Sequence, residues 1–299
     1  MYIITHHDAD GILSAATLMR AIPQKFWIYF SSPNRLFSTI CTTLLNTEGR
    51  DTLYICDISG SQKSIGVAAV YDKVFWLDHH VWEDCKTPNN ITLVLDVESK
   101  SATRVVGNYT GIFDFVEVAD EIDTNNVVTD TAERFRTVTF AIKMIYPRHE
   151  VYRALYDLTA TIAEKGLGAI YRPIFDELIA RYNVVIEAAI NKAIMTKKDY
   201  KLGTVTVSII TMPDSIPIAP LFNRIENSGI DVLVFVTKKD NEEGGVITKL
   251  EFRTQTEYDV LKIARAFGGG GHKRASGASV RGEISADQIL EKIRSTCGW

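Results

Sequence analysis

Three short apolar segments in the first eighty residues each end in carboxylate or imidazole side chains, and this pattern constrains the fold strongly. Residues 2–5 (YIIT) run into the sequence HHDADG, and residues 52–56 (TLYIC) end at Asp57. Residues 74–77 (VFWL) end at the sequence DHH, residues 78–80. Apolar runs of this length are typical of buried strands. Because helical patterns separate them, the sequence predicts an N-terminal α/β domain with a mostly parallel sheet and flanking helices.

The polar residues that follow these strands are expected to meet in one place. In an open parallel sheet, functional groups gather beyond the carboxyl ends of the strands. Carboxylates crowded together repel one another unless cations lie between them. Oxygen and imidazole ligands without thiolates suit Mn²⁺, Mg²⁺, Fe²⁺ or Zn²⁺. The ligands are numerous enough for two ions that share a carboxylate, an arrangement that promotes displacement at phosphorus. The residues concerned are His6, Asp8, Asp10, Asp57, Asp78, His79 and His80.

The rest of the chain predicts a helical linker and a second, smaller α/β domain. Further strands are expected at 26–30 and 92–97, and helices at 63–71 and 113–122. Asp130 and Glu133 resemble a capping box that opens a helix to about residue 145, and Pro173 suits the first turn of a long helix to about residue 197. The polar stretch TKKDYKLG follows, so we place the domains at 1–197 and 198–299. The last hundred residues predict strands at 202–211, 230–238 and 246–254, and helices at 259–267 and 286–296.

Composition excludes several classes of protein. The 37 acidic and 33 basic residues give a net charge of −4, which argues against a protein that coats long nucleic acid. The four cysteines form no C-x-x-C pair, so neither a structural zinc site nor a disulfide framework is predicted. Neither a secretory signal nor an apolar run of membrane-spanning length is present. We therefore expect a cytoplasmic protein with no membrane partner.

A glycine-rich segment, GGGGHKRASGAS, predicts an anion site in the C-terminal domain. Consecutive glycines let backbone N–H groups approach an anion closely. His272, Lys273 and Arg274 follow the glycines, and Arg253 ends a predicted strand nearby. These cationic or hydrogen-bonding side chains strengthen the case for a phosphate site over a merely flexible loop.

Taken in order, these motifs resemble those of the DHH phosphoesterase superfamily with a C-terminal DHHA1 domain. That group includes RecJ-type exonucleases, nano-RNases and cyclic-dinucleotide phosphodiesterases. The resemblance covers nearly the whole chain. Its motifs correspond to His6, Asp8 and Asp10, then Asp57, then Asp78-His79-His80, and finally Gly268 to His272 with Ala275-Ser276-Gly277.

The resemblance also implies a role for each residue. One metal ion would be bound by His6, Asp8 and Asp57, and a second by Asp10, Asp57, His79 and a further aspartate. His80 would contact the scissile phosphate, and Asp78 would orient the imidazoles. Substrate would be held across an interdomain cleft, and the residues implied are Arg253, Gly269, Gly270, Gly271, His272 and Arg274.

The further aspartate has two candidates in the sequence VEVADEIDTNN. The family usually shows a small residue before this aspartate, which favours Asp120 after Ala119. An Asp-Thr pair also occurs in relatives, and Asp123-Thr124 fits that pattern. We favour Asp120 and keep Asp123 as the alternative, which would otherwise cap the helix end or support the site.

The resemblance implies a Mn²⁺-dependent phosphodiesterase that cuts short oligonucleotides or linear dinucleotides to mononucleotides with two divalent ions; Mg²⁺ or another divalent ion is the alternative. The length favours short substrates over long duplexes, because RecJ-type nucleases carry an extra nucleic-acid-binding domain. The alternatives are a cyclic-dinucleotide phosphodiesterase, a nucleoside phosphate phosphatase, a RecJ-like single-strand exonuclease and an inactive nucleotide-binding protein. The sequence does not decide whether the protein forms a homodimer.

Overall fold

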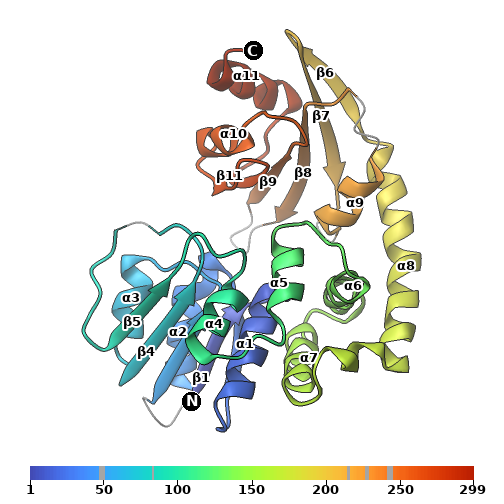
Figure 1. Cartoon of the computed structure of the whole chain (residues 1–299). Coiled ribbons are helices and arrows are strands. Elements are labelled where there is room, and N and C mark those ends of the chain that lie inside the picture. The colour runs from blue at the N-terminus through green and yellow to red at the C-terminus, as the bar shows by residue number, and fades with distance from the viewer. Residues whose placement is uncertain (47–50, 83, 214–215, 226–228, 241–244) are drawn as a thin grey trace. The chain divides into compact units, whose positions relative to one another are not determined.

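The computed structural model describes residues 1–46, 51–82, 84–213, 216–225, 229–240 and 245–299. They divide into two compact units, Met1–Tyr182 and Asn183–Trp299, whose elements are labelled in Figure 1. This division falls inside helix α8 (Pro173–Ile194). The domain limit predicted at residues 197 and 198 lies between the end of α8 and the next strand.

The first unit is built on a parallel sheet, as the sequence predicts. Among the described residues its strand order is β2-β1-β3-β4-β5, and all neighbouring pairs are parallel. Strand β1 therefore lies between β2 and β3, so the next two strands along the chain are added on opposite sides of it. The strands are β1 (Tyr2–His6), β2 (Trp27–Ser31), β3 (Thr52–Cys56), β4 (Lys73–Asp78) and β5 (Ile91–Leu95).

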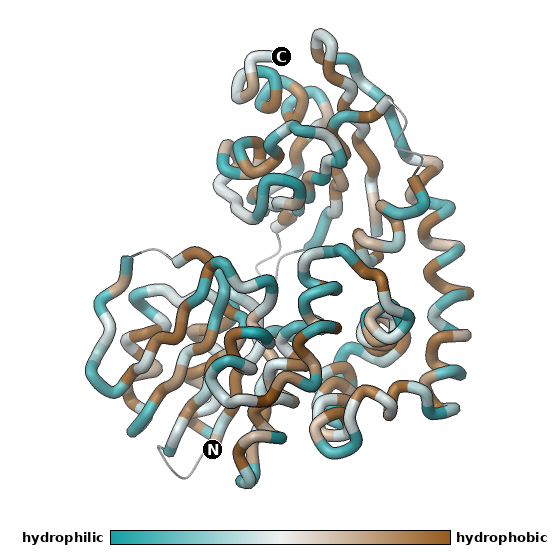
Figure 2. The backbone as a smooth tube through the Cα atoms, viewed as in Figure 1, coloured by the Kyte–Doolittle hydropathy of each residue, from teal (hydrophilic) through white to brown (hydrophobic). Residues whose placement is uncertain are grey.

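Alternation along the strands gives this sheet two buried faces. Ile3 and Leu77 pack with helices α1 (Ala9–Ala21) and α4 (Ala102–Thr110). Ile55 and Trp76 pack on the other face, against α2 (Leu36–Leu45) and α3 (Gln62–Ala68). Because both faces are covered, the central strands β1, β3 and β4 are largely apolar, and Figure 2 shows brown stretches in this sheet. The α4 segment is a helix that the sequence patterns did not predict.

Helices complete the first unit. They are α5 (Val116–Asp123), α6 (Asp130–Ile145), α7 (Val151–Lys165) and the first part of α8, with short 3-10 turns at Pro33–Arg35 and Leu167–Tyr171. The predicted capping box at Asp130 is wrong by one residue, because the Thr129 side chain accepts the bond from the N–H of Ala132. Among the described helices, none has both the length and the apolar character needed to cross a bilayer.

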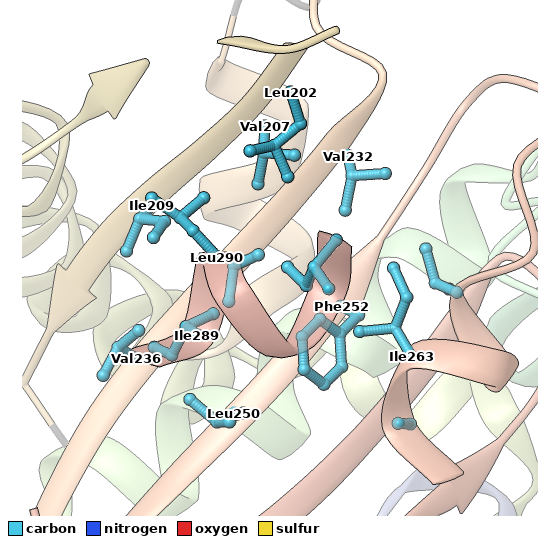
Figure 3. Close-up of a cluster of buried hydrophobic side chains, with 14 of the residues drawn as sticks. Leu202, Val207, Ile209, Val232, Val236, Leu250, Phe252, Ile263, Ile289 and Leu290 are labelled. Carbon is cyan, nitrogen blue, oxygen red and sulfur yellow. The ribbon is translucent and has the colours of Figure 1, made fainter. Parts of the chain in front are cut away.

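The second unit has a mixed sheet covered by two helices. Within the described residues the strand order is β10-β11-β9-β8-β7-β6, and the β7–β8 pair is parallel whereas the others are antiparallel. Phe252, Ile263, Ile289 and Leu290 are part of its core (Figure 3). The elements are β6 (Lys198–Leu202), β7 (Val205–Met212), α9 (Ile218–Arg224), β8 (Val232–Asp240), β9 (Val246–Arg253), α10 (Val260–Ala266), β10 (Gly270–Gly271), β11 (Ala275–Arg281) and α11 (Ala286–Cys297).

Strand β6 differs from the sequence prediction, which treated this polar stretch as a boundary. It pairs antiparallel with β7 and lies at the edge of the sheet. An edge strand exposes most of its surface, so charged residues such as Lys198 and Lys201 are compatible with it. The apolar signal that predicts interior strands is therefore absent here.

Candidate metal centre

The sheet topology brings the predicted metal ligands of the first unit to one edge. In the order β2-β1-β3-β4-β5, the strand order reverses at β1 and β3, and ligands typically bind outside the carboxyl ends of strands at such a point. His6 ends β1, Asp57 follows β3, and Asp78 ends β4. Helix α5, which ends at Asp123, adds a further carboxylate.

His6, Asp8 and Asp57 form one group whose ligand atoms lie within 4.8 Å of one another. His6 Nδ1 is 2.6 Å from Asp8 Oδ2 and 3.7 Å from Asp57 Oδ2. Burial opposes the ionisation of Asp8, but the charge and hydrogen bond of His6 hold its pKa well below the usual range. Asp8 also caps α1 by accepting a bond from the N–H of Gly11. A Cβ at Gly11 would lie 2.2 Å from the carbonyl oxygen of His6, so only glycine fits this tight turn.

Asp10, His79 and Asp123 form a second group with the same 4.8 Å limit. His79 Nδ1 lies 3.1 Å from the carbonyl oxygen of Ser99, which can only accept, so this nitrogen carries the proton. The lone pair of His79 is therefore on Nε2. That atom lies 3.6 Å from Asp123 Oδ2 and 3.8 Å from both Asp10 Oδ2 and Asp57 Oδ1.

Asp57 links the two groups. Its Oδ2 faces His6 and its Oδ1 faces His79, as in a carboxylate that bridges two cations. Its backbone has φ 58°, a left-handed conformation that costs about 1 kcal/mol or more and is concentrated at functional sites. Burial, followed by the charges of Asp8 and Asp10, raises the pKa of Asp57 well above its usual value. Burial and the same two charges raise the pKa of Asp123 to about 8.

These residues fit divalent cations. In the described part of the chain, Asp57 Oδ2 and His79 Nε2 are buried atoms without a hydrogen-bond partner. Leaving a buried acceptor unpaired costs about 1–3 kcal/mol, so such atoms call for an explanation. Ligand atoms about 2.1 Å from one ion are about 3–4 Å apart, which matches the separations of 3.6 to 3.8 Å around His79. Cations at these positions would satisfy both atoms and offset the repulsion among the carboxylates.

Asp10 also holds the start of α4. Its carboxylate accepts bonds from the N–H of Ala102 at 2.6 Å and from the N–H and hydroxyl of Thr103 at 2.8 and 2.6 Å. Each carboxylate oxygen has two lone pairs, so these bonds leave room for a cation. The bonds fix the orientation of Asp10, and Ala102 and Thr103 are supporting residues that the sequence motifs did not reveal.

A chain of hydrogen bonds orients His80. Its Nδ1 lies 2.8 Å from Asp78 Oδ1, and the indole N–H of Trp82 donates to Asp78 Oδ2 at 2.7 Å. Asp78 is fully buried. Burial alone would lower the pKa of His80, but the bond to Asp78 and the charges of Asp78, Asp123 and Asp10 raise it to about 8. His80 can therefore carry a proton at neutral pH, and Trp82 is a supporting residue that the sequence did not point to.

The two candidate aspartates of α5 differ in their surroundings. Asp120 accepts bonds from the hydroxyl of Ser101 at 2.6 Å and from Nε of Arg104 at 2.8 Å. Asp123 lies beside His79 and belongs to a potential metal group. The geometry therefore favours Asp123 as the further metal ligand and gives Asp120 a supporting role. The sequence favoured Asp120 because a small residue precedes it. Spacing along the chain does not show which face of α5 lies toward His79.

His7 lies beside the metal groups. Its ring stacks on His6, with centroids 4.7 Å apart. Burial, together with the charges of Lys143 and His6, lowers the pKa of His7 to about 3, so the ring is neutral at physiological pH. His7 Nδ1 is also buried and unpaired within the described residues. Lys143 of α6 affects the pKa of both His7 and Asp8, and its proximity was not apparent from the sequence.

The glycine segment of the second unit forms a tight hairpin. Gly270 and Gly271 pair with Gly277 and Ser276 of β11. A Cβ at Gly269 would lie 2.0 Å from the carbonyl oxygen of Gly277, and one at Gly271 2.7 Å from the Cα of Ser276. A Cβ at Gly270 would meet nothing within 4 Å. Packing therefore explains two of the glycines, whereas Gly270 has open space before it.

The basic residues near this hairpin have acidic neighbours. Arg253 Nη2 lies 2.9 Å from Glu251, and its Nη1 donates to the carbonyl of Phe252 at 3.0 Å. Arg274 lies 3.6 Å from Glu257. His272 is exposed, and its N–H donates to the carbonyl of Ala275 at 2.8 Å. The assignment of these residues to substrate binding stays a prediction.

Comparison with known proteins supports the resemblance. Residues 203–298 match the DHHA1 domain family, whereas no curated protein matches the chain. The pGpG-specific phosphodiesterase PggH from Vibrio cholerae is 14% identical with a TM-score of 0.60, and the alignment covers 99% of this chain and 98% of PggH. RecJ from Thermus thermophilus, in complex with Mn²⁺, is 14% identical with a TM-score of 0.61 over 99% of this chain and 52% of RecJ.

A third solved structure carries the DHH domain by name. It is the DHH domain of a protein described as a member of a ribosomal-protein family, 14% identical with a TM-score of 0.55, and the alignment covers 98% of this chain and 85% of that one. At this identity the likeness shows a shared fold. The comparisons therefore show a match to the DHHA1 domain at residues 203–298 and, over almost the whole length of the chain, a fold shared with PggH, RecJ and this DHH domain.

Proposed function

We propose that the protein is a metal-dependent phosphodiesterase that hydrolyses short oligonucleotides or linear dinucleotides to mononucleotides. The observation that carries this proposal is the position of Asp57, whose two oxygens face two separate groups of carboxylates and imidazoles. Two divalent cations, Mn²⁺ in the first place, would be held by His6, Asp8 and Asp57 and by Asp10, Asp57, His79 and Asp123.

The chain's own residues would position the substrate and move protons. When bound, divalent cations activate water and stabilise the charge that develops at phosphorus. His80, with its pKa near 8, can donate a hydrogen bond from a protonated ring to a phosphoryl oxygen. Asp78 keeps that ring oriented through its bond to Nδ1. His6 Nδ1 and Asp8 Oδ2 lie 2.6 Å apart, so the two side chains are held together where a cation would bind.

The substrate class is inferred from the fold and the charge. PggH, which matches this chain over almost the whole length of both proteins, is specific for the dinucleotide pGpG. RecJ is an exonuclease, and this chain spans only 52% of the RecJ from Thermus thermophilus. The net charge of −4 also disfavours broad contact with long strands. These observations favour a short, linear substrate for this chain.

The test is a turnover assay with a matched pair of variants. Metal-stripped protein would be supplied with Mn²⁺ and a series of 5′-phosphorylated oligonucleotides from two to ten residues long. Asp57→Asn keeps the size of the side chain and tolerates the left-handed backbone, but it removes the bridging charge. Asp51→Asn changes an exposed aspartate just before β3, at the opposite end of the same strand. We expect Asp57→Asn to lose turnover and Asp51→Asn to retain it.

The outcomes separate the alternatives. Rates that fall sharply beyond a few residues support the proposal, whereas rates that rise with length favour a RecJ-like exonuclease. Turnover of cyclic dinucleotides in preference to linear ones would assign the chain to that substrate. Binding of dinucleotides without any hydrolysis would show a nucleotide-binding protein. Full activity of Asp57→Asn would overturn the metal assignment.

A further inference from the structure

A pocket in the first unit has the character of a site for a flat ring. Its volume is about 370 Å³, and it lies between strand β2, helix α2 and the first turn of α7. Tyr29, Phe30 and Tyr152 contribute aromatic rings to its wall. Arg35, Ser38 and Thr42 contribute polar groups. The combination of aromatic faces with hydrogen-bonding groups is typical of sites that hold nucleobases.

A series of rings connects this pocket with the metal groups. The His6 ring, next to Asp8 and Asp57, stacks on His7 with centroids 4.7 Å apart and planes 25° apart. The His7 ring stacks on Tyr152 at 6.4 Å and 27°. Tyr152 in turn lies 6.0 Å from the ring of Phe30. The pocket wall is therefore two rings away from a predicted metal ligand.

Tyr152 has the exposure that a stacking platform needs. Its side chain belongs to the first turn of α7 and is 44% exposed, although one side of its ring is covered by His7. An exposed tyrosine that stays fixed against another ring offers a rigid flat surface at a low cost in conformational entropy. A second pocket, of about 430 Å³ among α6, α7 and α8, is lined by both acidic residues, Glu150 and Asp157, and basic residues, Arg153 and Arg172.

We propose that Tyr152 and the pocket beside it bind one nucleobase of the substrate while the adjacent phosphodiester lies at the metal groups. This inference rests on the proposed phosphodiesterase function and adds a base-binding site within the DHH unit. The aromatic rings stack on the base. The hydroxyls of Ser38 and Thr42 donate to backbone carbonyls, and their oxygens can accept a hydrogen bond from the polar edge of the base. Because stacking does not depend on one hydrogen-bond pattern, the site accepts any base but favours purines, whose stacking surface is larger.

Binding can be measured without turnover. In the Asp57→Asn background with Mn²⁺ present, a dinucleotide that contains 2-aminopurine would be titrated and its fluorescence recorded. We expect the fluorescence to be quenched on binding, because 2-aminopurine stacks on a ring. Adding Tyr152→Ala should raise Kd by about 5- to 150-fold, the range for the loss of one base–aromatic stack. Tyr152→Phe should retain tight binding because it keeps the ring.

Tyr171→Ala is the matched control. Tyr171 is 49% exposed, also belongs to the first unit, and does not line this pocket. In the active protein, Tyr152→Ala should raise KM more for pApA than for pUpU, with a smaller effect on kcat, whereas Tyr171→Ala should change neither constant. Thermal melting of each variant checks that the fold is intact.

The inference is overturned if the wild type hydrolyses dinucleotides but Tyr152→Ala keeps the same Kd and KM. It is also overturned if Tyr152→Phe is as impaired as Tyr152→Ala, since the ring would then not be the relevant feature. Failure of the phosphodiesterase proposal gives a different result, because the wild type itself would then leave both dinucleotides intact.

Discussion

Replacing Trp82 by phenylalanine tests whether the indole N–H positions the site. The change removes the 2.7 Å bond to Asp78 Oδ2 and keeps an aromatic ring in the same place. That ring packs edge-on against Trp76, with centroids 4.9 Å apart, and close to Gly60, where a Cβ would lie 2.6 Å from it. Asp78 would keep its bond to His80 but lose its second partner.

The magnitude follows from the burial of Asp78. A hydrogen bond to a charged group contributes about 1.5–3 kcal/mol, and Asp78 is fully buried, so we expect a loss of about 2 kcal/mol. For a unit of this size that corresponds to a fall in Tm of about 4–8 °C. Because Asp78 orients His80, kcat should fall about 10- to 100-fold, as it does when the partners of ligating residues are removed. KM should change little, because no group proposed to bind the substrate is removed.

Steady-state kinetics on a dinucleotide and thermal melting would be compared with Trp76→Phe. Trp76 is fully buried whereas Trp82 is half-buried, and the indole N–H of Trp76 donates to the carbonyl of Ile58 at 2.8 Å instead of to a carboxylate. We expect Trp76→Phe to lower Tm at least as much while reducing kcat less. The reasoning would be refuted if Trp82→Phe kept kcat within about threefold of the wild type, or if both variants lost kcat equally.

Three further predictions concern the glycine hairpin, the ionisation of the metal groups and the choice between two aspartates. Gly269→Ala should destabilise the second unit by about 1–3 kcal/mol, because its Cβ would meet backbone, whereas Gly270→Ala should leave Tm unchanged; equal melting of the two would contradict the packing account. Without metal, the raised pKa values of Asp57 and Asp123 mean that the folded protein holds protons that the unfolded chain has released, so stability should fall as pH rises from 6.5 to 8. Mn²⁺ should therefore raise Tm more at pH 8 than at pH 6.5, and melts with EDTA and with Mn²⁺ would show an equal gain if the carboxylates are not ligands. Asp123→Asn should weaken Mn²⁺ binding in a calorimetric titration much more than Asp120→Asn, and the reverse order would restore Asp120 as the ligand.

Much of the first unit could be predicted because its strands are short, apolar and buried on both faces. The sequence TLYIC forms β3 with the predicted limits, and Asp57 follows it as expected. The carboxyl ends of parallel strands lie at the same edge of a sheet, however long the connections between the strands are. The sequence alone therefore predicts that ligands more than seventy residues apart lie together. The resemblance to the family relied on the same residues.

Other parts of the site depend on tertiary contacts that no local pattern carries. The packing of α5 decides which of its two aspartates faces His79. Asp123 lies beside His79, whereas Asp120 accepts a hydrogen bond from Arg104 of α4. In the sequence, Trp82 is an ordinary apolar residue that follows DHH, and only the structure shows that its indole N–H donates to Asp78. Strand β6 was missed because edge strands tolerate the charges that otherwise indicate a loop.

The bonds of Asp10 have a consequence for how the protein folds. They join residue 10 to the start of α4 at residues 102 and 103, and the metal groups also draw on residues 57, 79 and 123. Closing such long loops slows folding, because chain entropy is lost before the contacts form. The complete set of ligands therefore exists only when β1, β3, β4, α4 and α5 have all docked. Cation binding thus reports completion of the first unit.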